Sequence, residues 1–225
     1  MGRYDRNMLT LTKEENDSLR EKKISVIGCG GLGGYIIEML GRLGIGTIVA
    51  VDGDVFEESN LNRQILSDVT VIDKSKAMQA YERMKIVNPD INLIPIIENF
   101  TKENCKSILQ GCHIAVDALD SIESRMLLQE CCEELGIPMV HGAIAGWYGQ
   151  ITTIFPGDKT LDKIYSNCKD SNIKNPLGNP SFIPALTASI EVSEVVKLLI
   201  GRGENFRNKM LMIDLLENNF EIIQL

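Results

Sequence analysis

The stretch Ile24-Ser25-Val26-Ile27-Gly28-Cys29-Gly30-Gly31-Leu32-Gly33 decides the fold of this chain. A short apolar run ends at a cluster of glycines, and apolar residues then recur at helical spacing from Leu32 to Leu43. This order predicts a strand, a tight glycine turn and a helix. The glycines would let the backbone approach a phosphate chain, whose charge is favoured by the amides and dipole at a helix start.

A second strand completes a βαβ unit. Gly44 and Gly46 end the helix, and 47–51 predicts a strand that terminates in Asp52. The two strands should be parallel, since a helix joins them. A carboxylate at the end of the second strand typically accepts hydrogen bonds from the ribose hydroxyls of a nucleotide. Asp52 is therefore a candidate nucleotide ligand; the alternative is a local turn made by its side chain.

The rest of the sequence continues the alternation of strand and helix, and we expect a doubly wound, Rossmann-like α/β sheet that is parallel in its first half. No repeat or linker divides the chain, which predicts a single domain over 1–225 with an N-terminal segment at 1–22. A long crossover loop is expected at 156–183, where prolines and glycines interrupt the periodicity. The remaining predicted elements are a helix from near Asp73 to 87, helices at 101–109, 122–135 and 184–200, strands at 91–97, 113–116, 139–141 and 150–155, and a C-terminal hairpin of 209–216 and 220–225.

Length and charge favour a globular protein with its own core and argue against nucleic-acid-binding and membrane proteins. A chain of 225 residues buries roughly 70% of its unfolded surface, enough for a sizeable core. Its 23 basic and 31 acidic residues give a formal net charge of −8, which argues against nonspecific binding of nucleic acid or anionic membranes. The opening residues are too polar for a secretory signal, and no apolar run reaches membrane-spanning length. We expect a cytoplasmic protein with neither nucleic acid nor membrane as a partner.

The cysteines argue against a zinc site and against a disulfide framework. Six cysteines contain no Cys-x-x-Cys pair, which excludes a zinc site built from two such pairs, and they are too few for a disulfide framework in a chain of this length. The doublet Cys131-Cys132 falls in a predicted helix, where we expect core packing and no redox chemistry.

The segment Asp52-Gly53-Asp54-Val55-Phe56-Glu57-Glu58-Ser59-Asn60-Leu61-Asn62-Arg63-Gln64 separates two classes of nucleotide-binding enzyme. Up to Asp52 the sequence suits a nicotinamide-dependent oxidoreductase equally well. This segment resembles the ThiF/MoeB/HesA family, bacterial relatives of ubiquitin-activating enzymes, in which Asp-x-Asp precedes an Asn-Leu-x-Arg-Gln stretch, then a lysine and an aspartate. The matching residues here are Lys76 and Asp120. The opening 3–7 is similar to the family's Arg-Tyr-x-Arg-Gln, and the correspondence runs from about 3 to 154 and returns at 184–200.

The resemblance implies ATP-dependent adenylation of the C-terminal glycine of a small ubiquitin-like sulfur-carrier protein, of the ThiS/MoaD type used in thiamin or molybdopterin biosynthesis, with release of pyrophosphate. Such a reaction depends mostly on alignment and neutralisation of charge. The resemblance implies that Arg63 and Lys76 supply positive charge, that Asp120 holds magnesium, and that Arg6 reaches into the site of a second subunit of a homodimer. The candidate ATP ligands are Gly28, Gly30, Gly31, Gly33, Asp52, Asp54, Asn60, Arg63 and Lys76.

The sequence departs from the family pattern at its cysteines. Family members commonly carry two Cys-x-x-Cys pairs for zinc; neither is present, so no zinc is expected. The family often has a cysteine in the long loop, which would match a position near 176, and the only candidate, Cys168, is displaced. Cys168 is either the site of a covalent adduct or an ordinary loop residue.

Several alternatives stay open at this stage. Asp120-Ser121-Ile122-Glu123 has the form of a helix cap, so Asp120 could cap a helix as well as bind metal. Arg63, taken alone, could be an exposed loop arginine. For the whole protein, the alternatives to adenylation are an NAD(P)-dependent oxidoreductase, which the glycine turn and Asp52 alone support, and a partner-binding module that has lost catalysis.

Overall fold

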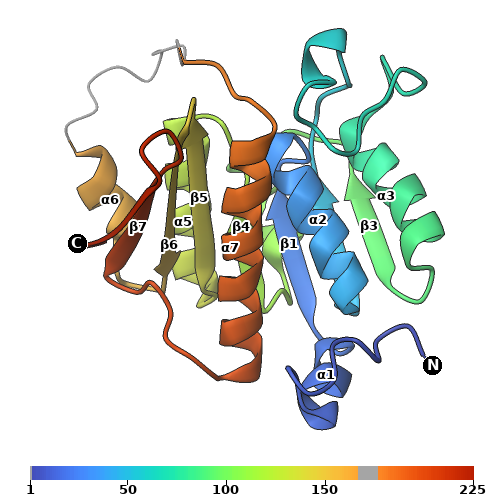
Figure 1. Ribbon diagram of the computed structural model, residues 1–225, viewed down its shortest axis with the longest axis horizontal. Coiled ribbons are helices and arrows are strands. Elements are labelled where there is room, and N and C mark those ends of the chain that lie inside the picture. The colour runs from blue at the N-terminus through green and yellow to red at the C-terminus, as the bar shows by residue number, and fades with distance from the viewer. Residues whose placement is uncertain (1, 167–176) are drawn as a thin grey trace.

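An eight-stranded sheet with helices on both faces forms the centre of the computed structural model, which describes residues 2–166 and 177–225 (Figure 1). The strand order is β3-β2-β1-β4-β5-β6-β7-β8. The strands are β1 (Lys23–Ile27), β2 (Thr47–Val51), β3 (Asn92–Ile96), β4 (Ile114–Asp117), β5 (Met139–Ala145), β6 (Tyr148–Ile154), β7 (Lys209–Asp214) and β8 (Asn219–Gln224). The helices are α1 (Lys13–Leu19), α2 (Gly31–Leu43), α3 (Lys76–Val87), α4 (Cys105–Leu109), α5 (Ile122–Leu135), α6 (Thr160–Tyr165) and α7 (Phe182–Ile200), with a 3₁₀ turn at Glu58–Asn60.

The first five strands of the order are parallel, and the remaining pairs are antiparallel. β1 pairs in parallel with β2 on one side and with β4 on the other, with Ile27 opposite both Val51 and Asp117. From β5 onward the chain returns through antiparallel neighbours, ending in the β7–β8 hairpin. The predicted fold class, parallel in its first half with a C-terminal hairpin, is confirmed.

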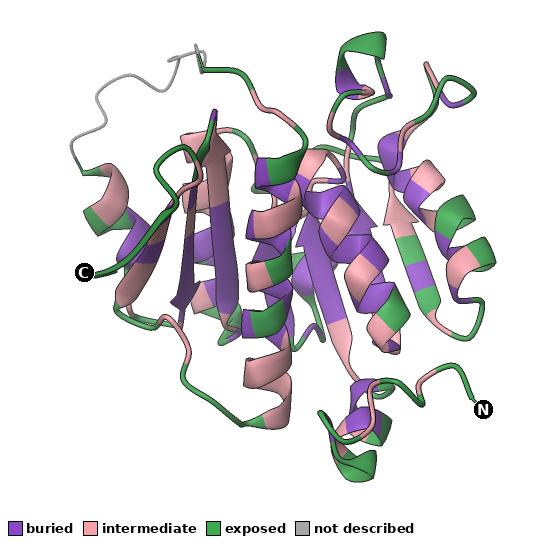
Figure 2. Cartoon of the chain, in the orientation of Figure 1, coloured by how far each residue is buried: buried purple, intermediate pink, exposed green. Residues whose placement is uncertain are grey.

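Two apolar layers hold the helices against the sheet, because successive strand residues point to opposite faces. On β1, Val26 faces the cluster that includes residues of α2, α3 and α7, and Ile27 faces the cluster with α4, α5 and α6. Figure 2 shows the buried residues concentrated in the central strands and on the inner sides of these helices. The central parallel strands β1, β2 and β4 are buried on both faces, as helices covering both sides require, whereas the edge strand β3 is partly exposed.

The segment between β6 and α7 departs from the prediction of a continuous loop. Helix α6 lies inside 156–183, and α7 begins at Phe182, two residues earlier than expected. α6 has no capping side chain at its first turn, and its position depends on Gln129 of α5, whose side chain accepts a hydrogen bond from the amide of Leu161 (2.8 Å) and donates one to Asp162 (2.7 Å). Such tertiary stabilisation is not visible in local periodicity. Cys168 lies outside the described residues.

The cysteine doublet also differs from the prediction. Both residues are buried, as expected for core packing, but Cys131 forms a disulfide with Cys105, joining α5 to α4. Cys132 is a free buried thiol, and burial raises its pKa. Among the described helices, none is both long and apolar enough to cross a membrane.

Candidate functional site

A cavity of about 460 Å³ opens beyond the carboxyl ends of β1, β2 and β4, beside the first turn of α2. After β1 the chain moves outward to β2 and β3, and it then returns to β4 on the other side of β1. Ligands in open α/β sheets bind at this kind of topological switch point. The volume falls within the range of small-molecule sites.

Glycine is required at two positions of the turn between β1 and α2. Gly28 has φ of 102°, and a Cβ there would lie 2.5 Å from the carbonyl oxygen of Ala118. A Cβ on Gly33 would overlap the carbonyl oxygen of Gly28. The N-cap of α2 is Gly30, and no side chain caps this helix. The amides of its first turn are therefore left for a ligand, which suits a phosphate group.

The carboxylate of Asp52 accepts hydrogen bonds from two backbone segments beside the cavity. One oxygen accepts a hydrogen bond from the amide of Cys29 (2.8 Å), and the other accepts from the amide of Asp54 (2.8 Å). Burial raises the pKa of Asp52, an effect that these two hydrogen bonds and Lys76 oppose. The local turn considered in the sequence analysis is thus present. It does not exclude a ribose contact, because each carboxylate oxygen accepts more than one hydrogen bond.

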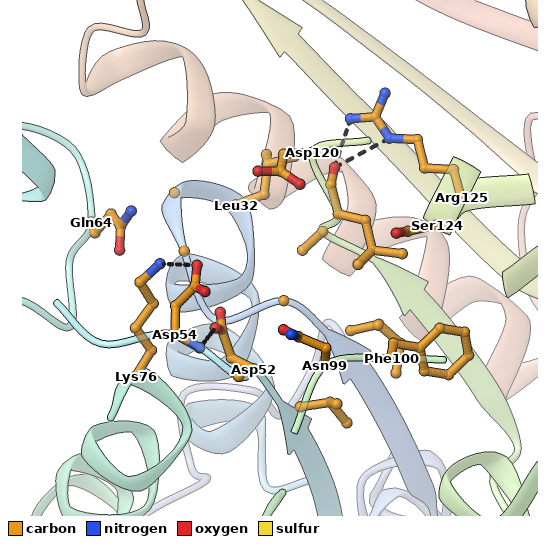
Figure 3. A pocket seen from close by; sticks show the side chains of 18 of the residues that line it. Leu32, Asp52, Asp54, Gln64, Lys76, Asn99, Phe100, Asp120, Ser124 and Arg125 are labelled. Atoms are coloured by element: carbon orange, nitrogen blue, oxygen red, sulfur yellow. Dashed lines mark hydrogen bonds and ion pairs between the residues drawn. The ribbon is translucent and has the colours of Figure 1, made fainter. Parts of the chain in front are cut away.

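Lys76 is the first residue of α3 and pairs with Asp54, with 3.0 Å between Nζ and the carboxylate (Figure 3). Its backbone amide also donates to the carbonyl of Asp54 (3.0 Å). A positive charge at a helix start is disfavoured by the helix dipole, and the partner carboxylate offsets this. Only 10% of the Lys76 side chain is exposed, so the ammonium group is held at the cavity wall.

The loop before α3 contributes two residues that line the cavity, Arg63 and Gln64, and a third, Asn60, that only stabilises the loop. Arg63 lines the cavity, and its guanidinium donates to the carbonyl of Ser59 (2.9 Å) and to the side chain of Asn62 (2.8 Å). Gln64 also lines it, is 6% exposed, and has an Oε1 atom with no hydrogen-bond partner among the described residues. Asn60 does not line the cavity: it is buried, and its side chain accepts from the amide of Glu57 (3.1 Å), which fixes the 3₁₀ turn.

Asp120 stands on the opposite wall, after β4, with an exposed side chain (Figure 3). The N-cap of α5 is Ser121, whose hydroxyl accepts from the amide of Ser124 (3.2 Å), so the capping role considered for Asp120 is wrong. Across the described ranges no group of three or more His, Cys, Asp or Glu side chains is arranged to hold a metal ion. A single carboxylate still fits magnesium that is carried by a nucleotide, because this ion commonly uses one or two carboxylates together with phosphates and water.

Arg6 lies far from this cavity within its own chain. Tyr4, two residues earlier, packs against Gly44, the residue that ends α2, whereas the cavity lies at the beginning of α2. The 13 residues of α2 span about 20 Å. The N-terminal segment accordingly lies at the opposite end of the strands, near the start of β1 (Figure 1).

The structure thus brings together eight of the residues selected from the sequence: Gly28, Gly30, Gly31, Asp52, Asp54, Arg63, Lys76 and Asp120. Gly33 supports the turn from behind. The cavity is also lined by residues that were not predicted from the sequence: Gln64, Asn99, Phe100, Ser124 and Arg125. Gln64 follows directly on Arg63 and was within reach of the motif. Asn99 and Phe100 follow β3 and reach the site through the strand order, which local sequence does not display, whereas Ser124 and Arg125 lie in the first turns of α5, close to Asp120 in the sequence.

Comparisons with known proteins identify relatives that match nearly the whole chain. The model of the ThiF family matches residues 4–225. The SAMP-activating enzyme E1 of Haloferax volcanii is 31% identical over 99% of this chain and 84% of its own length. The sulfur carrier protein adenylyltransferase of Thermus thermophilus is 29% identical over 98% of this chain and 85% of its own. A crystal structure of E. coli MccB with succinimide has a TM-score of 0.86 at 22% identity, covering 99% of this chain and 70% of that one; MccB has also been solved with ATP.

Proposed function

This chain belongs to the ThiF family, and from that membership we propose that it adenylates the C-terminal glycine carboxylate of a small ubiquitin-like sulfur-carrier protein. ATP is consumed and pyrophosphate is released. Two relatives that match nearly the whole chain support the proposal by their names, one a sulfur carrier protein adenylyltransferase and the other a SAMP-activating enzyme. We further propose that the carrier serves thiamin or molybdopterin biosynthesis and that the protein is cytoplasmic.

One observation carries the proposal: the cavity at the switch point of the sheet brings the uncapped start of α2 together with the cations of Arg63 and Lys76 and the exposed carboxylate of Asp120. The uncapped amides suit phosphate oxygens, and Arg63 and Lys76 suit the charge of a triphosphate. Asp120 faces them from the opposite wall. An oxidoreductase would need the glycine turn and Asp52 but would leave these three side chains without a common task.

The chemistry proposed for the site is a substitution at phosphorus. A carboxylate oxygen of the carrier forms a bond to the α-phosphorus, the bond from that phosphorus to the bridging oxygen of the β-phosphate breaks, and pyrophosphate leaves with the electron pair. The amides at the start of α2 and the cations of Arg63 and Lys76 hold the phosphates and neutralise charge as it develops on them. Magnesium bound with the nucleotide would add positive charge there, and Asp120 is the residue proposed to hold it.

We also propose that the working unit is a homodimer. Arg6 is too far from the cavity of its own chain to contact a nucleotide bound there. An arginine supplied by a second copy would complete each of two sites without any change in the position of the N-terminal segment on its own subunit. The same symmetry would give both sites identical geometry.

ATP–pyrophosphate exchange tests the proposed function. With a sulfur-carrier protein that ends in glycine, the wild-type protein should incorporate labelled pyrophosphate into ATP. Lys76→Ala should lower the rate by at least 100-fold, as expected for the loss of a cation that stabilises developing charge. Lys74→Ala is the matched control, because Lys74 is an exposed lysine two residues away that does not line the cavity.

The outcomes separate the candidate functions. Exchange in the wild type that is lost in Lys76→Ala but kept in Lys74→Ala supports adenylation. Binding of the carrier without exchange or ATP binding would identify a partner-binding module and overturn the proposal. Stabilisation against heat by NAD or NADP, with none by magnesium-ATP, would favour the oxidoreductase.

A further inference from the structure

A buried polar network lies directly behind the loop that carries Asp120. Asp117, at the end of β4, is fully buried, and one of its oxygens accepts a hydrogen bond from the amide of Leu119 (2.9 Å). The other oxygen lies 2.6 Å from Nδ1 of His141, a fully buried residue of β5. This contact assigns the ring proton to Nδ1 and leaves Nε2 as an acceptor.

Arg125 of α5 binds the same loop from the other side. Its guanidinium donates two hydrogen bonds to the carbonyl oxygen of Leu119, from Nε (3.1 Å) and from Nη2 (2.7 Å), as Figure 3 shows. Nε also lies 3.8 Å from the buried carboxylate of Asp117, and only 12% of the Arg125 side chain is exposed. Both backbone polar groups of Leu119, the residue before Asp120, are therefore bound by side chains of this network.

The network continues into the segment between β6 and α7. The hydroxyl of Tyr165, the last residue of α6, accepts a hydrogen bond from Nη1 of Arg125 (2.9 Å) and lies 3.4 Å from Nε2 of His141. The two rings meet edge to face, with 6.1 Å between centroids. Because Gln129 holds α6 on α5, the position of this short helix and the orientation of the Arg125 guanidinium are linked.

We propose that Arg125 is a positioning residue: held by Asp117 and Tyr165, it fixes the backbone of Leu119 and thereby the place of the Asp120 carboxylate in the cavity. His141 supports it by orienting both Asp117 and the Tyr165 hydroxyl. The inference rests on the proposed function, since the role of Asp120 belongs to that proposal. It adds that α6, far from the glycine turn in the sequence, sets the geometry of the nucleotide site.

The test uses two conservative variants, each with a matched control. Tyr165→Phe removes only the hydroxyl. Arg125→Lys keeps the positive charge but removes the guanidinium group that donates two hydrogen bonds to the Leu119 carbonyl oxygen. The controls are Tyr81→Phe, which removes a hydroxyl beside Lys85 on α3, and Arg83→Lys, which breaks an equivalent two-bond pair with Glu38. None of the control residues lines the cavity.

Amide hydrogen exchange gives a readout that does not depend on catalysis. The Leu119 amide should exchange at least tenfold faster in Tyr165→Phe and Arg125→Lys than in the wild type and in both controls. The Cys29 amide, which Asp52 binds on the other wall, should keep its protection in all five proteins. Equal loss of protection at the Leu119 and Cys29 amides would indicate general destabilisation and overturn the inference. An unchanged exchange rate at the Leu119 amide would also overturn it.

Kinetics provide the second readout. In ATP–pyrophosphate exchange, Tyr165→Phe should lower kcat about tenfold and raise the magnesium concentration for half-maximal rate, with the KM for ATP within twofold of wild type. Faster amide exchange without any change in kcat or magnesium dependence would show a structural network only and overturn the inference. If the wild type shows no ATP–pyrophosphate exchange, the proposed function and the reaction role of this network fail together, while the amide data still decide whether the network holds the loop.

Discussion

The glycine at position 33 cannot be replaced without moving the turn that forms the cavity, because a Cβ there would overlap the carbonyl oxygen of Gly28. We predict that Gly33→Ala lowers the free energy of unfolding by about 1–3 kcal/mol, as overpacking does. It should also abolish the stabilisation that magnesium-ATP gives the wild type. Thermal unfolding with and without magnesium-ATP measures both effects.

Gly34 provides the control for this prediction. It is the next residue of the same helix, and a Cβ there would meet side-chain carbons of Ile65 and Leu66 at 3.3 Å, which can shift. Gly34→Ala should therefore retain binding of magnesium-ATP. Similar losses in the two variants would mean that the effect comes from the helix and not from the approach to Gly28.

A second residue, Glu191 of α7, is buried without a use in the proposed chemistry. It is fully buried against Gly142, and neither carboxylate oxygen has a hydrogen-bond partner among the described residues. Burial raises its pKa well above the ordinary value, and the charge of Asp117 adds to the effect while Arg125 opposes it. The carboxylate form is therefore unfavourable in the folded protein.

We predict that Glu191→Gln stabilises the protein, increasingly so as the pH rises. An acid whose pKa is raised on folding binds more protons in the folded state between the unfolded value, near 4.5, and the folded one, so its contribution to stability falls as pH rises through that window. Glutamine removes this dependence. Urea unfolding at pH 5, 6, 7 and 8 should show a widening gap between variant and wild type.

The comparison separates the contribution of Glu191 from that of His141, another buried group whose pKa is shifted. Burial lowers the pKa of His141, although Asp117 opposes this, and a lowered pKa makes stability increase as pH rises toward the unfolded value. Because both proteins contain His141, its contribution cancels in the difference. A gap that stays constant from pH 5 to pH 8 would contradict the raised pKa of Glu191.

At the scale of secondary structure, one covalent bond joins two helices on the same face of the sheet. The Cys105–Cys131 disulfide, with a sequence separation of 26, links the five-residue α4 to α5. We predict that Cys105→Ser lowers the free energy of unfolding by about 2–4 kcal/mol, the range expected for closing a loop of this size. Urea unfolding under non-reducing conditions measures the difference.

Reductant supplies the control for the disulfide prediction. Dithiothreitol should lower the stability of the wild type to that of Cys105→Ser and leave the variant unchanged. Counting thiols by alkylation and mass spectrometry decides whether the bond forms. Two free thiols at positions 105 and 131 in the untreated protein would contradict the prediction.

The sequence is informative about elements that carry their own signals. Strand β1, the glycine turn and α2 could be predicted because an apolar run, a glycine cluster and helical spacing follow one another directly. Helix α1 also carries a signal, the capping box of Thr12 and Glu15, which the sequence analysis did not use. Helix α6 carries none: its N-cap, Lys159, is in the left-handed region, and contacts with α5 hold it.

The candidate site likewise contains some residues that the sequence identifies and others that only the fold brings together. Asp52, Lys76 and Asp120 could be selected because they belong to a recognisable motif. The buried pair of Asp117 and His141 could not, since it forms only when β4 and β5 become neighbours in the sheet. Sequence alone also placed Asp120 as a potential cap, whereas the hydroxyl of Ser121 performs that role. Which residue caps a helix, and which buried groups pair, depends on short side-chain contacts that only the backbone geometry determines.

At the scale of the whole molecule, the N-terminal segment is fixed at the end of the sheet opposite the cavity (Figure 1). Arg3 donates to the carbonyl of Val87 (2.6 Å), and the side chain of Asn88 donates to the hydroxyl of Tyr4 (2.8 Å). These contacts hold the segment against the end of α3. For Arg6 to act on a nucleotide, it must therefore come from another copy of the chain.

Mixing two inactive variants tests this arrangement. Arg6→Ala and Asp120→Ala should each lose ATP–pyrophosphate exchange as homodimers. In a heterodimer one site combines the Asp120 of one subunit with the Arg6 of the other, and the second site lacks both. Random exchange of subunits makes half of the dimers mixed, so the mixture should recover about a quarter of the wild-type rate.

The recovery depends on subunit exchange and on dimer formation, and both can be measured separately. Light scattering gives the mass of each variant, and differently tagged copies show by co-purification that mixed dimers have formed. A matched mixture of Lys76→Ala with Asp120→Ala should stay inactive, because both residues line the cavity of one chain and every site lacks one of them. If Arg6 served its own subunit, the first mixture would behave in the same way, since no site would then hold both groups. Verified mixed dimers without recovered exchange would thus overturn a role for Arg6 in the partner's site.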